Sequence, residues 1–206
     1  MYTVQDLMPG KPLDKVVEDY TTASKENVVR LLVAITKSLS ILHKYNIFHG
    51  DIKYENILFD GTLAYFIDFG LSCKTDEFGM VRQDSNLIMH NAPYAFLRQR
   101  QTVGFFHQET TEWKNGSTLS LKTDVYALGK TFQQLIKKIE LNDPKINALI
   151  NSMCKDKAEE RPSLTQVEQS FGLIISGWAS RELLEKSIQP EGGVQQAKQS
   201  GLMGKF

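Results

Sequence analysis

Apolar residues recur at helical spacing in several stretches of the chain. The clearest pattern lies between about Ser24 and Lys44 and consists of Val28, Leu31, Leu32, Ile35, Leu39 and Leu42. Side chains three and four residues apart share one face of a helix, so this stretch predicts an amphipathic helix with one buried stripe. Ser24 can cap its first turn, and we expect it to end at Asn46. Weaker patterns predict further helices over Asp124 to about Ile139, over Ile146 to Met153, after Ser163, and over about Ser180 to Ile188. Ser163 and Gln166 have the spacing of a capping box at the start of the third of these.

Strand-like patterns are short. Residues 1–13 contain Tyr2 and Val4 and predict a strand that stops at Pro9-Gly10.

Residues 71–123 are polar and aperiodic, with a turn signal at Asn115-Gly116. From Gly177 onward the chain is rich in Gln, Gly and Ser, and we expect a mobile tail after Pro190.

A β-hairpin is predicted in the first third of the chain. Ile57–Phe59 and Leu63–Phe69 read as two strands, and they flank Asp60-Gly61. This dipeptide favours a tight type I′ turn. The hairpin brings Asp68 back beside Asn56, although twelve residues separate them in sequence.

Composition narrows the class of protein without naming a function. The 206 residues suit one domain, and 41% hydrophobic and 23% charged residues are ordinary for a soluble globular protein. A formal net charge of zero gives no reason to expect nucleic acid or an anionic membrane as a partner. The longest apolar run, Leu31–Ile35, is too short to span a bilayer, and the N-terminus lacks the features of a signal peptide. Cys73 and Cys154 lie far apart, which favours reduced thiols and a cytoplasmic location.

Residues 49–70 carry the candidate chemistry. They contain H-G-D-I-K-Y-E-N-I-L-F from His49 to Phe59 and I-D-F-G from Ile67 to Gly70. Two acids and an amide in this arrangement, with a lysine two residues after the first acid, can hold Mg²⁺ against a nucleotide triphosphate while a hydroxyl attacks it.

This segment resembles the eukaryotic-type protein kinase superfamily, whose pattern is H-R-D-x-K-x-x-N followed by D-F-G. The resemblance implies ATP and Mg²⁺ as cofactors and a protein substrate. Asp51 would be the catalytic base, Lys53 would reach the γ-phosphate, and Asn56 and Asp68 would hold Mg²⁺. His49 would be structural and would pack beside the D-F-G segment.

The resemblance extends over about residues 2–175. D-V-Y-A-L-G, beginning at Asp124, and E-E-R-P-S, beginning at Glu159, are similar to elements of the kinase large lobe. The implied fold is a kinase-like C-lobe, mainly α-helical with a small catalytic β-hairpin. We expect residues 1–13 to form the last small-lobe strand and hinge, 14–176 the lobe, and 177–206 a polar tail. Asp124 would brace the catalytic-loop backbone, Gly129 would permit close helix packing, and Phe69 would lie in the core.

The chain departs from the family pattern at four places. Gly50 replaces the arginine that normally receives a phosphorylated activation segment, so we expect that switch to be lacking. A-P-Y at Ala92–Tyr94 replaces A-P-E, and 29 residues separate it from Asp124. Arg161 would then need another acid, for which Glu109, Glu112 and Glu159 are the candidates. No glycine-rich loop, strand lysine or helix glutamate precedes Asp51, so we expect the small lobe to be absent from this chain.

Three functions remain open at this point. The first is Mg-ATP-dependent phosphorylation of protein Ser or Thr when a small lobe is present, supplied by a partner or by upstream sequence. The second is an inactive kinase lobe that binds proteins. The third is a small-molecule kinase of the aminoglycoside phosphotransferase type, which Lys53 disfavours. The M-P-G-K-P-L segment starting at Met8 and the short loop without R-D also resemble compact kinases of bacterial effector type, which implies delivery into a host cell as an effector.

Overall fold

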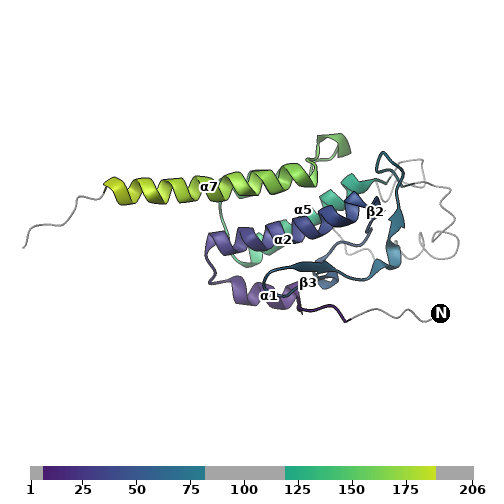
Figure 1. Ribbon diagram of the computed structural model, residues 1–206, viewed down its shortest axis with the longest axis horizontal. Coiled ribbons are helices and arrows are strands. Elements are labelled where there is room, and N and C mark those ends of the chain that lie inside the picture. Colours follow the sequence, from purple (N-terminus) through teal and green to yellow (C-terminus); the bar gives the residue numbers. More distant parts are fainter. Residues whose placement is uncertain (1–6, 82–118, 189–206) are drawn as a thin grey trace, which may run out of the picture.

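The computed structural model describes residues 7–81 and 119–188 (Figure 1). Its helices are α1 (Leu13–Tyr20), α2 (Lys25–Lys44), α5 (Leu121–Lys138), α6 (Pro144–Met153) and α7 (Leu164–Ile188), with 3-10 turns η1 (Tyr54–Asn56), η2 (Phe69–Leu71) and η4 (Ala158–Glu160). The expected strand at Tyr2 and Val4, the A-P-Y segment, the turn at Asn115-Gly116 and the tail after Pro190 lie outside the described residues.

Two small antiparallel sheets accompany these helices. The first has the strand order β1-β3-β4, with β1 at Lys11–Pro12, β3 at Ile57–Phe59 and β4 at Ala64–Phe66. In the second, β2 (Ile47–Phe48) pairs with β5 (Cys73–Lys74). The prediction of a mainly helical fold with a small hairpin is therefore confirmed. No helix in the described ranges is both long and apolar enough to cross a bilayer.

Helix α2 lies at the centre of the core, and its predicted bounds are confirmed. The Ser24 side chain accepts the Asn27 N–H, as an N-cap should. At the other end Asn46 has a φ of +53°, a left-handed conformation that asparagine tolerates and that ends the helix. The buried stripe of α2 packs against α7 on one side and against β4 on the other (Figure 1).

Helix α1 was not predicted. Leu13, Val16 and Val17 are buried, and Tyr20 packs against them at the next helical position. Their spacing is that of an amphipathic helix, although no helix was predicted there. Proline is well tolerated just before the first helical turn, so Pro12 marks the start of α1 and not an interruption.

The predicted hairpin forms, but its turn differs from the prediction. Phe59 pairs with Ala64, which leaves four residues in the loop. A type I′ turn needs positive φ at both central residues, and here Gly61 has a φ of +101° while Asp60 does not have positive φ. Instead, the Asp60 carboxylate accepts the N–H groups of Thr62 and Leu63, which closes a wider loop.

The last three helices also form, with changes at their ends. Helix α5 begins three residues before Asp124, because Ser120 and Thr123 form a capping box. Asp143 caps α6. The Ser163–Gln166 capping box before α7 is confirmed by two hydrogen bonds. Helix α7 then continues to Ile188 without a break. The residues predicted as a short helix over about 180–188 are therefore helical, but they belong to α7, which crosses the expected boundary at 176/177.

Close packing of α5 against α6 depends on a glycine. A Cβ atom placed on Gly129 would lie 2.7 Å from the Cys154 sulfur and 2.9 Å from Met153 Cβ. Both distances are shorter than a van der Waals contact allows, so only glycine fits without movement. The expected role of Gly129 in helix packing is confirmed.

Candidate active site

Asp51 is the centre of a small hydrogen-bonded cluster in the loop between β2 and η1. Its side-chain Oδ2 atom accepts the Lys53 ammonium at 2.8 Å and the Asn56 amide at 2.9 Å. The same Asn56 amide also donates to the Asp51 backbone carbonyl at 2.8 Å. Asp51 is only 7% exposed, and the two donors fix its orientation. Three of the four predicted site residues are therefore in direct contact.

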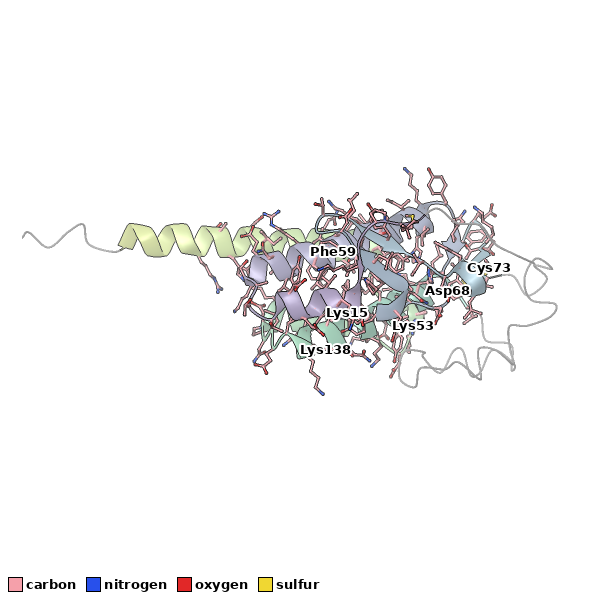
Figure 2. All side chains as sticks on the ribbon, turned by 90° about the horizontal axis from the view of Figure 1, so that it is seen from below. Lys15, Lys53, Phe59, Asp68, Cys73 and Lys138 are labelled. Atoms are coloured by element: carbon pink, nitrogen blue, oxygen red, sulfur yellow. The ribbon has the colours of Figure 1, made fainter. Side chains whose placement is uncertain are left out.

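Asp68, the fourth predicted residue, lies beside this cluster because the hairpin folds back. The Ile67 N–H donates to the Asn56 carbonyl at 3.0 Å, which puts the next residue alongside η1. Asp68 is exposed, has a φ of +61°, and accepts the Gly70 N–H at 3.3 Å. In Figure 2, Lys53 and Asp68 lie at the opposite end of the molecule from the projecting end of α7.

The donors that could hold a metal ion suit Mg²⁺. The Asn56 nitrogen is committed to Asp51, so the amide oxygen is the atom left to act as a ligand, and the Asp68 carboxylate offers a second oxygen. Mg²⁺ prefers oxygen ligands and commonly retains waters or takes phosphate oxygens. No three His, Cys, Asp or Glu side chains gather into a metal cage within residues 7–81 and 119–188, so these other ligands would be needed here.

Asp124 braces the loop that contains Asp51, as the resemblance implied. This carboxylate is 1% exposed and accepts two backbone N–H groups, those of His49 at 2.8 Å and Gly50 at 3.0 Å. It also lies 3.2 Å from Nε2 of His43. His43 comes from the end of α2 and has no motif around it, so nothing in the sequence marked it as part of the site. Asp124 therefore ties α5 to the loop that contains Asp51 and to α2.

His49 is structural, as predicted. The side chain is fully buried between the rings of Phe66 and Phe69, with centroids 5.3 and 5.1 Å away. Its Nδ1 atom accepts the Asp51 N–H and its Nε2 atom lies 3.2 Å from the Ile67 carbonyl, which fits a neutral ring protonated at Nε2. Burial lowers the pKa of His49 and outweighs the nearby carboxylates, which raise it. His49 thus joins the loop to the D-F-G segment.

Gly50 has a backbone that disfavours any side chain. Its φ is +79°, and a Cβ atom would lie 2.8 Å from the Leu71 carbonyl oxygen and 3.0 Å from the Phe48 ring. The arginine found at this position in many kinases would meet both obstacles in this conformation. The expected absence of a phosphorylation switch, which follows from glycine in place of arginine at position 50, remains a prediction.

One side of the candidate site is open and apolar. A pocket of about 360 Å³ lies next to the D-F-G segment, between α2 and β4, and is lined by Met8, Ser38, Ile41, Leu42, Tyr65, Phe66, Ile67 and Phe69. Phe69 is 37% exposed, so the expectation that it lies in the core is wrong. Its ring contacts His49 and also borders this pocket.

Arg161 is buried, and the described residues around it supply backbone carbonyl oxygens and an aromatic ring. Its guanidinium donates to the backbone carbonyls of Lys122, Lys155 and Asp156, and lies 4.9 Å from the centroid of the Tyr126 ring. The backbone carbonyl of Arg161 in turn accepts the Lys122 ammonium. Of the three proposed acidic partners, Glu109 and Glu112 lie outside the described residues. Backbone carbonyl oxygens therefore help to stabilise the buried guanidinium of Arg161.

Comparison with known proteins agrees with this geometry. Residues 1–143 match the protein kinase domain. The chain is 29% identical to a probable serine/threonine-protein kinase of Dictyostelium discoideum, over 69% of this chain and 10% of that protein. It is 25% identical to a probable serine/threonine-protein kinase of Clostridium perfringens (66% and 18%) and 27% identical to a G-type lectin S-receptor-like serine/threonine-protein kinase of Arabidopsis thaliana (90% and 20%).

The chain thus spans a fifth or less of the length of these three relatives. The protein kinase domain match covers well over half of the 206 residues. On that basis, the chain belongs to the protein kinase domain family, within the eukaryotic-type protein kinase superfamily.

Proposed function

We propose that this chain is the large lobe of a serine/threonine-type protein kinase and that it transfers phosphate from Mg-ATP to a protein hydroxyl when a nucleotide-covering lobe is present. The observation that carries the proposal is the bonded cluster of Asp51, Lys53 and Asn56, with Asp68 adjoining it. The serine/threonine names of the relatives support the substrate class. A cytoplasmic location remains a prediction.

Each residue of the cluster has a chemical role in this proposal. Asp51 orients the acceptor hydroxyl and takes its proton, while Lys53, now 2.8 Å from Asp51, neutralises charge on the transferred group. Asn56 and Asp68 supply oxygen ligands for the metal. Bound Mg-ATP would provide the phosphoryl group, and its Mg²⁺ would provide the positive charge that stabilises the phosphate oxygens. Burial of Asp51 strengthens these electrostatic effects by excluding water.

A second lobe is part of the proposal because the described residues leave Asp68 and the adjoining apolar pocket open to solvent. Phosphoryl transfer depends on alignment, whose worth can reach roughly 7–11 kcal/mol, and on exclusion of water. We therefore expect residues 1–206 alone to be a poor kinase. In this proposal residues 1–13 are the last small-lobe strand and the hinge, and the large lobe begins at about residue 14.

Nucleotide binding gives the first test. ¹⁵N NMR spectra of residues 1–206 should show shifts of the Asn56 and Asp68 amide signals when ATP and Mg²⁺ are added together. Each shift should be much smaller with ATP alone and in Asp68→Asn, and unchanged in the exposed control Glu18→Gln. The absence of any Mg²⁺-dependent shift at saturating ATP would contradict the catalytic proposal and favour the protein-binding module.

Transfer assays separate the remaining alternatives. With radiolabelled ATP and casein as a generic acceptor, we expect slow transfer to Ser and Thr that falls roughly 10²-fold or more in Asp51→Asn, the loss typical of a removed general base. Transfer to kanamycin in preference to casein would instead support a small-molecule kinase. Equal labelling of casein by wild type and Asp51→Asn would show that the cluster is not the source of the activity.

A further inference from the structure

A second, larger groove lies along α2, beside the candidate site. It has a volume of about 790 Å³ and is formed by the outer face of α2, the β3–β4 loop, and single residues of α1 and α7. Ser38, Ile41 and Tyr65 line both this groove and the smaller pocket beside Phe69, so the two hollows adjoin. The groove does not include Asp51, Lys53, Asn56 or Asp68.

The floor of the groove is apolar and partly exposed. Ile41 on α2 is 58% exposed and Leu63 in the hairpin loop is 55% exposed. Val33 and Ala34, about two helical turns before Ile41, continue the apolar surface along α2. A volume of this size can bury several side chains of a bound segment, and apolar contact of this kind supplies most of the affinity at peptide-binding grooves.

The helix that forms this groove is basic. Helix α2 contains Lys25, Arg30, Lys37 and Lys44 but only one acid, Glu26. Arg30 and Lys37 line the groove, and both are exposed. Arg30 pairs with Glu26 at 2.6 Å, whereas Lys37 has no ion pair among the described residues. Arg30, Lys37 and Lys44 follow one another at intervals of seven positions, so the three cations lie along one face of the helix.

The acid of the hairpin loop is already occupied. Asp60 accepts the Thr62 and Leu63 N–H groups and the Tyr65 hydroxyl, and these hydrogen bonds lower its pKa. Its carboxylate is thus engaged within the loop and does not neutralise Lys37. The groove combines an apolar floor with a cationic edge.

We propose that this groove docks a peptide segment of a partner protein that carries acidic side chains beside leucine-like ones. The apolar side chains fit against Ile41 and Leu63, and a carboxylate reaches Lys37. Charge complementarity of this type selects partners and steers their association. The inference goes beyond phosphoryl transfer, since it requires neither nucleotide nor the Asp51 cluster, and binding can therefore be measured without ATP.

The chain's own ends fit this chemistry poorly. Residues 189–206 contain a single acid, Glu191, and two lysines, and residues 1–6 contain one acid, Asp6. A second copy of α2 would bring the same basic face to the groove, and like charges oppose such pairing. An acidic partner segment is the occupant that the charges favour.

The test starts from a random twelve-residue peptide library displayed on phage and panned against residues 1–206 without nucleotide. The enriched sequences should combine Asp or Glu with Leu, Ile or Phe. A fluorescein-labelled enriched peptide should bind about tenfold more weakly to Lys37→Glu and to Ile41→Glu. Lys137→Glu, an exposed lysine of α5 outside the groove, should change the affinity by less than about twofold. Binding should also weaken between about 50 and about 500 mM salt.

Several results would overturn the proposal. They are the absence of enriched sequences, an enriched set without acids, and affinities that Lys37→Glu and Ile41→Glu leave unchanged. Tighter peptide binding after truncation at Ile188 would assign the groove to the chain's own tail. Light scattering that showed dimers of wild type but monomers of Ile41→Glu would assign it to a second copy. Circular dichroism should show both variants folded, since both side chains are exposed.

Discussion

Asp124 and Asp68 carry the same carboxylate at two sides of the candidate site, but their surroundings differ. Asp124 is buried and accepts the backbone N–H groups of His49 and Gly50. Asp68 is exposed and accepts the N–H of the nearby Gly70 at 3.3 Å. One acid is thus part of the folded framework, while the other is available for a ligand.

This difference indicates that the two sides of the candidate site have different structural roles. The loop with Asp51 and Asn56 is held by α5 through Asp124 and by the buried His49, so its geometry is fixed within this chain. The D-F-G segment borders an open apolar pocket, and Phe69 within it contacts the His49 ring. Preorganisation of the first region and openness of the second are expected if another structural element completes the site.

The largest effect should come from Asp124→Ala. This change leaves the buried N–H groups of His49 and Gly50 without their acceptor, and each such loss typically costs about 1–3 kcal/mol. We expect the free energy of unfolding, measured in urea, to fall by about 3–5 kcal/mol. Asp19→Ala, which removes an exposed acid, should change it by less than about 0.5 kcal/mol. A loss below about 1 kcal/mol for Asp124→Ala would refute the bracing role.

A smaller effect is expected from Gly50→Ala, which adds one methyl group to the braced loop. The left-handed φ costs a non-glycine residue about 1–2 kcal/mol, and contact at 2.8 Å with the Leu71 carbonyl adds to this. We expect a total loss of about 2–3 kcal/mol in unfolding free energy. Gly61→Ala is the matched control, because Gly61 also has positive φ but has no atom within 4 Å of its added Cβ. Equal losses for the two variants would show that the close approach at Gly50 is unimportant.

The braced loop was easier to predict from sequence than the parts around it. The H-G-D and I-D-F-G motifs placed Asp51, Lys53, Asn56 and Asp68, and the periodicity placed α2, because both signals are local. The type I′ turn was wrong because the Asp60 side chain closes the loop in another way. The exposure of Phe69 and the carbonyl ligands of Arg161 depend on tertiary packing, which no spacing in the sequence reveals.

The buried His49 predicts a pH dependence of stability. Because burial lowers its pKa in the folded protein below the usual value of 6.5, the unfolded chain binds a proton first as the pH falls. The stabilising contribution is complete above pH 6.5 and is lost as the pH falls from there toward the lowered folded-state value. Between about pH 7 and about pH 5 the free energy of unfolding should therefore fall, and His49 should account for part of that fall.

His49→Gln provides the comparison for this prediction. The variant should be less stable at all pH values but should show a shallower decline of unfolding free energy with acidification. Urea unfolding at several pH values measures both slopes. Identical slopes for wild type and His49→Gln would mean that His49 does not contribute to the pH dependence.

The smallest effect should come from Asp68→Asn, the counterpart of Asp124→Ala. Asparagine adopts the left-handed φ of Asp68 as readily as aspartate, and its side-chain oxygen can still accept the Gly70 N–H. We therefore expect the unfolding free energy to change by less than about 0.5 kcal/mol, as is usual for exposed positions. Mg²⁺-dependent ATP binding should nevertheless be lost, because the amide has no negative charge. A large loss of stability would show that Asp68 belongs to the framework, so that its effect on ATP binding could not be assigned to the metal. An unchanged stability with lost binding would establish that the two acids, alike in chemistry, serve the fold and the ligand separately.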